Sequence, residues 1–271
     1  MDQATYQKLE TVIDRMGRGI AVAVSGGVDS LPLATFVHRH SSVETEMYHA
    51  VSPAVPESST MRVKKLATKE GWMLRCLNAG EFEDQRYLEN PVNRCFYCKD
   101  NLYRTIVGNT KKQVVSGANI DDLGDFRPGM RAAKRFEVRH PYIEAGLTKE
   151  SVRELARALG LGGFADLPAS PCLSSRVETG IRVNPVVLPR LDKVEKMVSE
   201  ELSTDTVRCR VRGRGIVIAL NDEILSQISD EIKDKLVVTA RRLLDEASTT
   251  MIAFETYQKG TTFLTKLNVE E

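Results

Sequence analysis

Two groups of residues in the sequence could do chemistry: a set of cysteines and a glycine-rich segment. Cys95 and Cys98 form a Cys-x-x-Cys pair, and Cys172 follows much later in the chain. A spacing of three residues puts two thiols on one face of a helix, where both could bind the same metal. Arg94 and Lys99 flank the pair, and a cationic neighbour favours the thiolate form that metal binding and nucleophilic attack require.

The cysteine pair alone leaves several alternatives open. It is also typical of a redox dithiol or of half a zinc site, and Cys172, in the string Pro171-Cys172-Leu173-Ser174-Ser175-Arg176, could be an ordinary loop cysteine. Three thiolates suit an iron–sulfur cluster, whereas a structural zinc site needs a fourth ligand. The other two cysteines, Cys76 in an apolar run and Cys209 between arginines, are predicted to be structural.

The glycine-rich segment Ser25-Gly26-Gly27-Val28-Asp29-Ser30 directly follows the apolar run 20–24. Paired glycines let the backbone approach an anion closely, and the N-terminus of a following helix adds N–H donors and partial positive charge. The segment lacks the lysine and spacing of the kinase P-loop, and it lacks the third glycine of the dinucleotide fingerprint. A plain strand-to-helix turn also uses Gly and Ser. The preceding buried strand favours a phosphate-binding loop.

The elements that must position these residues alternate along the chain. Strands are expected at 20–24, 46–51, 72–77 and 113–117, and helices at 6–16, 31–39, 57–70, 93–107 and 149–159, the last capped by Thr148 and stopped at Gly160. This order predicts an α/β fold with a doubly wound, mostly parallel sheet. Ligands bind such sheets at the carboxyl ends of the strands, which makes Gly117 and Asn119 candidate binding residues.

The pattern changes after about Gly180. A helix is expected at 185–202, a hairpin of two strands at 207–211 and 216–220, helical segments at 222–246 and a last strand at 251–254. We therefore predict a first domain over residues 1–180 and a smaller α+β domain over residues 181–271.

Three arginines alternate in the first strand of that hairpin. Arg208, Arg210 and Arg212 are two residues apart, so their side chains share one face of the strand. Crowded guanidiniums repel one another unless an anion or an acidic surface offsets them, which makes the three arginines candidates for substrate binding. An RNA backbone would satisfy the same charges.

Composition narrows the classes of protein. The 271 residues carry 38 Lys and Arg against 37 Asp and Glu, a net charge of +1, which argues against binding nucleic acid by bulk charge. The apolar runs are too short to span a bilayer, and residues 1–18 lack the apolar core of a signal peptide. The odd number of cysteines argues against a disulfide framework. We expect a cytoplasmic protein that is not associated with membranes.

The segment 25–30, placed after the first strand, resembles the signature of the PP-loop ATP pyrophosphatase superfamily. Members of that superfamily split ATP into AMP and pyrophosphate while they adenylylate a substrate. The resemblance implies that Ser25, Gly26, Gly27, Asp29 and Ser30 bind ATP, with Asp29 acting near Mg²⁺.

Three segments taken together, Cys95-x-x-Cys98-Lys99, 117–129 and 171–176, resemble the LarE family of ATP-dependent sulfur transferases, and the similarity runs from about Val22 to Leu220. LarE proteins adenylylate a carboxylate of pyridinium-3,5-biscarboxylic acid mononucleotide and convert it to a thiocarboxylate in nickel-pincer nucleotide cofactor biosynthesis. One version of the family uses a single sacrificial cysteine. The other, which this sequence resembles, uses three cysteines that hold a 4Fe–4S cluster, so Cys95, Cys98 and Cys172 would be the ligands.

The chemistry of adenylylation suggests further candidates. Lys99 and Arg176, each close in sequence to a candidate cluster ligand, could hold phosphate or acyl-adenylate oxygens. Asp125, at the end of the acidic stretch 121–125, could bind Mg²⁺ or a ribose. The resemblance also implies sulfide or another sulfur donor as a partner, and a homo-oligomer, because LarE relatives form hexamers.

Two alternatives stay open. A PP-loop tRNA thiolation enzyme also has a three-cysteine cluster, but the sequence has no flanking zinc-ribbon cysteine pairs and its net charge is nearly neutral. A non-catalytic sensor would bind ATP without cleaving it.

Overall fold

The computed structural model describes residues 3–124, 127–168, 171–245 and 250–258 of the chain. They form two compact units, the first made of Met1–Asp84 and Asn93–Ser170, the second of Gln85–Val92 and Pro171–Glu271. The division falls at residues 170/171, ten residues before the predicted position, and a short segment from the predicted first domain joins the second unit. None of the described helices is long and apolar enough to cross a membrane.

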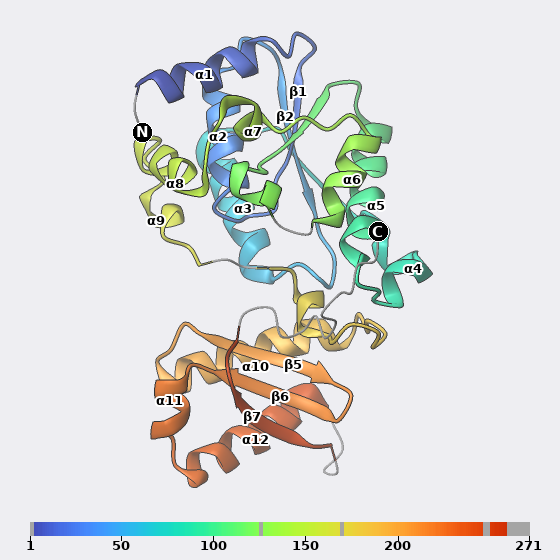
Figure 1. Ribbon diagram of the computed structural model, residues 1–271, viewed down its shortest axis with the longest axis vertical. Helices are drawn as coiled ribbons and strands as arrows, with labels where there is room; N and C mark the ends of the chain where they lie inside the picture. Colours follow the sequence, from blue (N-terminus) through green and yellow to red (C-terminus); the bar gives the residue numbers. More distant parts are fainter. Residues whose placement is uncertain (1–2, 125–126, 169–170, 246–249, 259–271) are drawn as a thin grey trace. The chain divides into compact units, whose positions relative to one another are not determined.

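The first unit is built on a parallel sheet of four strands, β1 (Ile20–Ala23), β2 (Thr45–Ala50), β3 (Leu74–Leu77) and β4 (Gln113–Ser116) (Figure 1). Their order is β3-β2-β1-β4, and all three neighbouring pairs are parallel. The central strand β1 is a short apolar run because both of its faces are covered. The predicted parallel sheet is confirmed.

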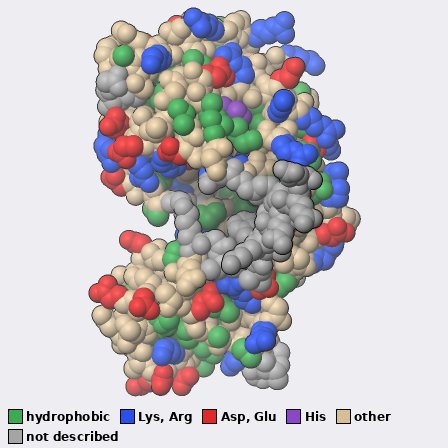
Figure 2. Space-filling view, in the orientation of Figure 1, with side chains coloured by type: hydrophobic (Ala, Val, Ile, Leu, Met, Phe, Trp, Pro, Cys, Tyr) green, Lys and Arg blue, Asp and Glu red, His purple; other side chains and the backbone are tan. Residues whose placement is uncertain are grey.

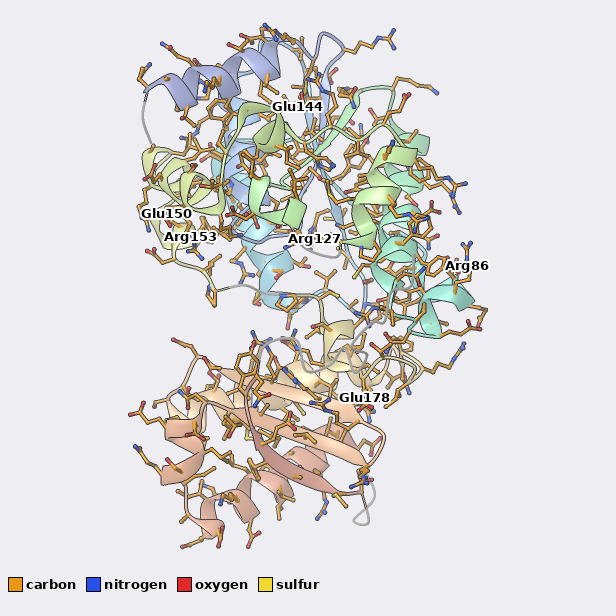
Figure 3. All side chains as sticks on the ribbon, viewed as in Figure 1. Arg86, Arg127, Glu144, Glu150, Arg153 and Glu178 are labelled. Carbon is orange, nitrogen blue, oxygen red and sulfur yellow. The ribbon has the colours of Figure 1, made fainter. Side chains whose placement is uncertain are left out.

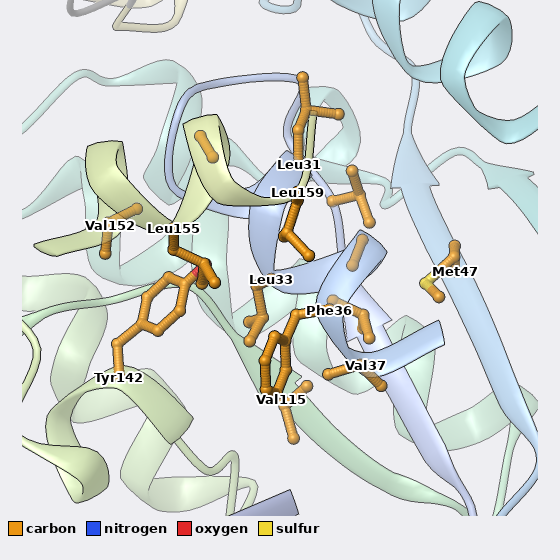
Figure 4. Packing of buried hydrophobic residues seen from close by; sticks show 14 of the residues in the cluster. Leu31, Leu33, Phe36, Val37, Met47, Val115, Tyr142, Val152, Leu155 and Leu159 are labelled. Atoms are coloured by element: carbon orange, nitrogen blue, oxygen red, sulfur yellow. The ribbon is translucent and has the colours of Figure 1, made fainter. Parts of the chain in front are cut away.

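Side chains of β1 alternate between two hydrophobic cores, one on each face of the sheet. Ile20 and Val22 pack into the larger core, whereas Ala21 packs into the smaller one. The larger core is built with α1 (Gln3–Asp14), α2 (Ser30–His40), α3 (Glu57–Glu70), α7 (Pro141–Ala145) and α8 (Lys149–Ala158), and part of it is shown in Figure 4. The smaller core is built with α5 (Arg94–Asn109) and α6 (Pro128–Arg135). Helices on both faces confirm the doubly wound architecture.

Local sequence signals set several helix ends. The backbone N–H of Ser151 donates to Thr148 Oγ1 (3.3 Å), which caps α8 as predicted. Gly160, in the left-handed conformation with φ +75°, follows the end of that helix. Two further helices, α6 and α7, each begin with a proline and were not expected from the sequence. The same holds for the short elements η1 (Glu81–Glu83), η2 (Ile120–Gly124) and α9 (Gly162–Ala165).

The second unit contains the predicted small sheet. Strands β5 (Val207–Arg212) and β6 (Gly215–Leu220) form an antiparallel hairpin, and β7 (Ile252–Thr256) pairs with β6 in parallel. The helices are α4 (Gln85–Leu88), η3 (Leu173–Arg176), α10 (Val187–Leu202), α11 (Asp222–Gln227) and α12 (Asp230–Leu244). The helical pattern 222–246 is thus two helices, because Ser229 caps a new one.

The segment Gln85–Val92 belongs to the second unit because it forms hydrogen bonds with residues that lie about ninety positions later in the chain. Asn90 Nδ2 donates to the carbonyls of Glu178 (2.8 Å) and Ile181 (2.9 Å). The backbone carbonyl of Asn90 accepts from Gly180 N–H (2.9 Å), and the Tyr87 and Ser174 hydroxyls lie 2.5 Å apart. These contacts fasten α4 to the chain that follows Cys172.

Candidate active site

The segment 25–30, hereafter the glycine loop, is a tight turn between β1 and α2. Ser30 Oγ accepts from the N–H groups of Ser25 (3.1 Å) and Gly26 (3.2 Å). Gly26 has φ +85°, and a Cβ built on it would lie 2.7 Å from the carbonyl oxygen of Ser59. Both the backbone angle and the close approach of α3 therefore require glycine at this position.

The middle of the glycine loop keeps donors for a ligand. Among the described residues, the N–H groups of Gly27 and Val28 have no hydrogen-bond acceptor. A Cβ on Gly27 would meet nothing nearer than Ser25 Oγ at 3.7 Å, so this side of the loop is open. Free amides before the N-terminus of α2 are suited to bind an anion such as phosphate.

Asp29, at the end of the glycine loop, is the centre of a polar cluster. Its carboxylate oxygens accept from Lys149 Nζ at 2.6 and 2.5 Å, and Asn119 Nδ2 donates to it at 3.2 Å. Asn119 is almost completely buried, whereas the side chains of Asp29 and Lys149 are 32% and 34% exposed. The loops after β1 and β4 and the start of α8 thus meet at the carboxyl edge of the sheet, where parallel sheets bind ligands.

Lys149 is a site residue that the sequence analysis missed. It is the first residue of α8, where a cation opposes the positive end of the helix dipole. That unfavourable placement is the signal that could have identified it, because a lysine kept there needs an anionic partner. Asp29 is the partner that the structure provides.

The loop after β4 is held by its own polar contacts. A Cβ on Gly117 would lie 2.9 Å from the carbonyl oxygen of Asp29, so glycine allows the two loops to touch. Asp122 accepts from Asn119 N–H (3.1 Å) and pairs with Arg127 (2.7 Å), which Figure 3 labels at the start of α6. The predicted Mg²⁺ or ribose residue, Asp125, lies outside the described residues.

The three predicted cluster ligands fall in different units. Cys95 and Cys98 lie in the first turns of α5, the helix expected at 93–107, and they are exposed and half-exposed. Lys99 Nζ lies 5.8 Å from the centre of the Tyr103 ring. Cys172, half-exposed, precedes η3 in the second unit. No three His, Cys, Asp or Glu side chains among the described residues are grouped to hold a metal ion, so convergence of the three thiols stays a prediction.

A basic surface lies on the helices around the cysteine pair. Lys and Arg side chains gather over α5 and α6 in Figure 2, and Arg104, Arg131, Lys134 and Arg135 are all exposed. Arg104 and Arg135 form ion pairs with the buried Asp100, and the positive charge that Arg131 and Lys134 add to this surface favours anionic ligands nearby.

Arg176 is engaged inside the second unit. Its guanidinium donates to both oxygens of Glu195, each at 2.9 Å, and to the carbonyl of Pro171 (3.0 Å). Glu195 also accepts from Cys209 N–H (2.9 Å). Burial lowers the pKa of Arg176, but the hydrogen bonds and charge of Glu195 outweigh burial and raise it above its ordinary value. Arg176 therefore fastens the Cys172 loop to α10 and β5; the predicted phosphate contact would have to share these donors.

The three alternating arginines of β5 already have partners. Arg212 pairs with Glu255 (3.0 Å), and Arg210 lies 3.8 Å from the same carboxylate. Arg208 and Arg210 both lie over the ring of Tyr257, at 5.8 and 5.6 Å. Burial lowers the pKa of both Arg208 and Arg210. The acidic surface that the charge argument required is thus supplied by the unit itself, and substrate binding by these arginines stays a prediction.

Comparison with known proteins identifies relatives over most of the chain. No family model matches the sequence. An uncharacterized protein of Synechocystis, slr1717, is 30% identical over 236 residues, 86% of this chain and 87% of its own. An uncharacterized protein of Methanocaldococcus jannaschii is 27% identical over 222 residues, 80% and 83% of the two chains. The pyridinium-3,5-bisthiocarboxylic acid mononucleotide synthase of Lactiplantibacillus plantarum is 27% identical over 198 residues, 70% of each chain. The first match shows that this chain belongs to one family with slr1717, and its similarity to the synthase supports the LarE family.

Proposed function

We propose that the protein is an ATP-dependent, AMP-forming sulfur transferase of nickel-pincer nucleotide cofactor biosynthesis. Its substrate would be pyridinium-3,5-biscarboxylic acid mononucleotide. The observation that carries this proposal is the glycine loop with its Asp29–Lys149–Asn119 cluster, at the ligand-binding edge of a parallel sheet, in a chain related to a bisthiocarboxylic acid mononucleotide synthase.

The reaction has two steps. A substrate carboxylate oxygen attacks the α-phosphorus of ATP, the bond to the pyrophosphate oxygen breaks, and an acyl-adenylate forms. Sulfur at the sulfide level then attacks the acyl carbon. The bond between that carbon and the oxygen it shares with the phosphate breaks, so AMP leaves with this oxygen and a thiocarboxylate remains. The first step is needed because a carboxylate has no adequate leaving group of its own.

The glycine loop would bind the pyrophosphate portion of ATP. The free N–H groups of Gly27 and Val28 and the N-terminus of α2 can donate to phosphate oxygens. Lys149 Nζ, adjacent to Asp29, adds a full positive charge at the same edge. These groups would stabilise the negative charge that collects on the transferring phosphate in the transition state.

Asp29 fits the predicted Mg²⁺. Magnesium prefers oxygen ligands and is bound through one or two carboxylates together with substrate phosphates. The Asp29 carboxylate is partly exposed next to the open side of the glycine loop, so it would hold the ion. When bound, Mg²⁺ neutralises phosphate charge.

The cysteines fit a 4Fe–4S cluster in their chemistry. Cys95, Cys98 and Cys172 are outside any disulfide and accessible to solvent, and three thiolates leave one iron of such a cluster without a protein ligand. These three residues would hold the cluster, which, when bound, supplies sulfur for the activated carboxylate. Sulfide or another sulfur donor would be required for further turnovers.

The adenylylation step can be tested by AMP and pyrophosphate formation from ATP with and without the mononucleotide. We expect substrate-dependent AMP formation, and Asp29→Asn should abolish it because the Mg²⁺ ligand is lost. Asp14→Asn changes an exposed carboxylate on α1 and serves as the matched control. Unchanged AMP formation in Asp29→Asn would contradict the proposed site. If the protein binds ATP but releases no pyrophosphate with any carboxylate substrate, the alternative of a non-catalytic ATP sensor is favoured.

The cluster can be tested by iron and sulfide assays after anaerobic purification. Cys95→Ala, Cys98→Ala and Cys172→Ala should each lower bound iron, whereas Cys76→Ala, at an exposed thiol of β3, should not. Retention of the full cluster after loss of one of the three thiols removes that residue from the ligand set. A salt-sensitive shift of tRNA in a gel would favour the tRNA thiolation alternative.

A further inference from the structure

A guanidinium from outside the glycine loop is fixed against the loop backbone. Arg62 lies on α3, the helix whose Ser59 carbonyl approaches Gly26. Arg62 Nε donates to the carbonyl oxygen of Gly26 (3.1 Å), and Nη2 donates to Ser59 Oγ (2.8 Å). One positive charge is therefore held at hydrogen-bond distance from the first glycine of the loop.

Arg62 is half-buried, and its hydrogen bonds within the described part of the chain go to neutral groups. No carboxylate among the described residues lies within ion-pair distance of it, and burial lowers the pKa of Arg62. Elsewhere in the same unit, even Arg39, whose side chain is 36% exposed, is paired with a carboxylate, that of Glu70, which also lies on α3. Partial burial of an unpaired charge is unfavourable, and an anionic ligand that binds beside it removes the penalty.

Two features now point to the same ligand. The amides of Gly27 and Val28 are open donors, and the unpaired guanidinium lies against the neighbouring Gly26. Neutral donors and an arginine fork are the groups that bind a multiply charged phosphate most strongly.

We propose that Arg62 binds the terminal phosphates of the nucleotide, and hence the pyrophosphate that leaves. This inference rests on the proposed ATP site and deepens it, because it assigns the counter-charge of the leaving group to α3. Lys149, by contrast, lies at Asp29, at the other end of the loop.

The test compares binding of ATP, inorganic pyrophosphate and AMP to the full chain by calorimetry. Arg62→Gln keeps an N–H donor for the Gly26 carbonyl but loses the charge, and Arg62→Met loses both. Lys65→Gln, at an exposed position of the same helix, is the matched control. We expect both Arg62 variants to weaken ATP and pyrophosphate binding by about 10- to 100-fold, the range of one hydrogen bond to a charged group, with AMP binding unchanged.

Salt dependence separates direct phosphate contact from support of the loop. A charge contact is screened, so the ratio of dissociation constants between Arg62→Gln and the wild type should shrink as the salt concentration rises. Pyrophosphate binding by Arg62→Gln at the wild-type level overturns the proposal. A loss that does not change with salt, or an equal loss of AMP binding, also overturns it, because Arg62 would then only support the loop. A wild-type chain that binds neither ATP nor pyrophosphate would instead reject the proposed ATP site itself.

Discussion

Replacement of Glu195 by Gln should destabilise the second unit strongly. Glu195 lies on α10 and holds the guanidinium of Arg176 through two hydrogen bonds of 2.9 Å. The side chains of Arg176 and Glu195 are only 5% and 11% exposed. Gln has nearly the same shape but no charge, and its amide nitrogen would face an Arg176 donor. The variant therefore leaves a buried guanidinium without its counter-ion.

The magnitude follows from the burial of the pair. Removal of one partner of a buried ion pair typically costs about 3–5 kcal/mol. With an unfolding slope of about 2 kcal/mol per molar urea, the urea midpoint should fall by about 1.5–2.5 M. A double variant, Arg176→Met with Glu195→Leu, removes both charges and should lose much less than Glu195→Gln alone.

Two optical probes can locate this loss. The chain has a single tryptophan, Trp72, which is buried in the first unit, so its fluorescence reports on that unit. Far-ultraviolet circular dichroism also reports on α10 and α12. We expect Glu195→Gln to move the transition seen by dichroism and to leave the fluorescence transition in place. Glu200→Gln, at an exposed position of α10, should move neither.

A shift of the urea midpoint below about 0.5 M, which for that slope corresponds to about 1 kcal/mol, would contradict the expected loss of stability. Such a result would mean that water or another acceptor replaces Glu195, so the pair would not fix the Cys172 loop. A shift that appears only in the fluorescence of Trp72 would likewise contradict the assignment of the pair to the second unit.

Three further predictions follow from the described contacts. Lys149→Met should lower AMP formation by about 10- to 100-fold, because the loss of one charge-assisted contact costs about 1.5–3 kcal/mol; a quantified AMP assay checks this. Gly26→Ala should abolish ATP binding, since its Cβ would clash with α3 at a left-handed backbone angle, whereas Gly108→Ala, on α5 and outside the glycine loop, where a Cβ would meet nothing within 4 Å, should bind ATP as the wild type does in the same calorimetric titration. Burial raises the pKa of the Cys209 thiol, so it stays protonated at pH 8 and should escape iodoacetamide in the folded protein, whereas the exposed Cys95 should react; mass spectrometry distinguishes the two.

Much of the fold could be predicted because its signals are local. The apolar run 20–24 is short and lies between glycines at 19 and 26, which favours a strand buried on both faces, and the structure divides its residues between two cores. The start of α8 followed from the cap at Thr148, and its end followed from the stop at Gly160. In contrast, α6 and α7 span only eight and five residues, too few turns for a periodic apolar pattern to identify a helix, and their stability comes from tertiary packing, for example of the buried Ala132.

The division into units could not be predicted for a related reason. The segment Gln85–Val92 is too short to carry a domain signal. Its membership is decided by hydrogen bonds from Asn90 to the carbonyls of Glu178 and Ile181, which are distant in sequence. The glycine loop was predictable because its residues are contiguous, whereas Lys149 and Arg62 reach it from other helices.

The arginines of β5 have the acidic neighbour that their crowding requires, and their role in substrate binding stays a prediction. Crowded guanidiniums do need an acidic surface, and β7 supplies Glu255 to Arg210 and Arg212 from across the intervening strand β6. A substrate anion would have to compete with that carboxylate for either side chain. Of the three arginines, Arg208 has no carboxylate within ion-pair distance among the described residues, and its contacts are the Tyr257 ring and the Val207 carbonyl. Among the three arginines, Arg208 is therefore the first candidate for binding the substrate's carboxylates or phosphate.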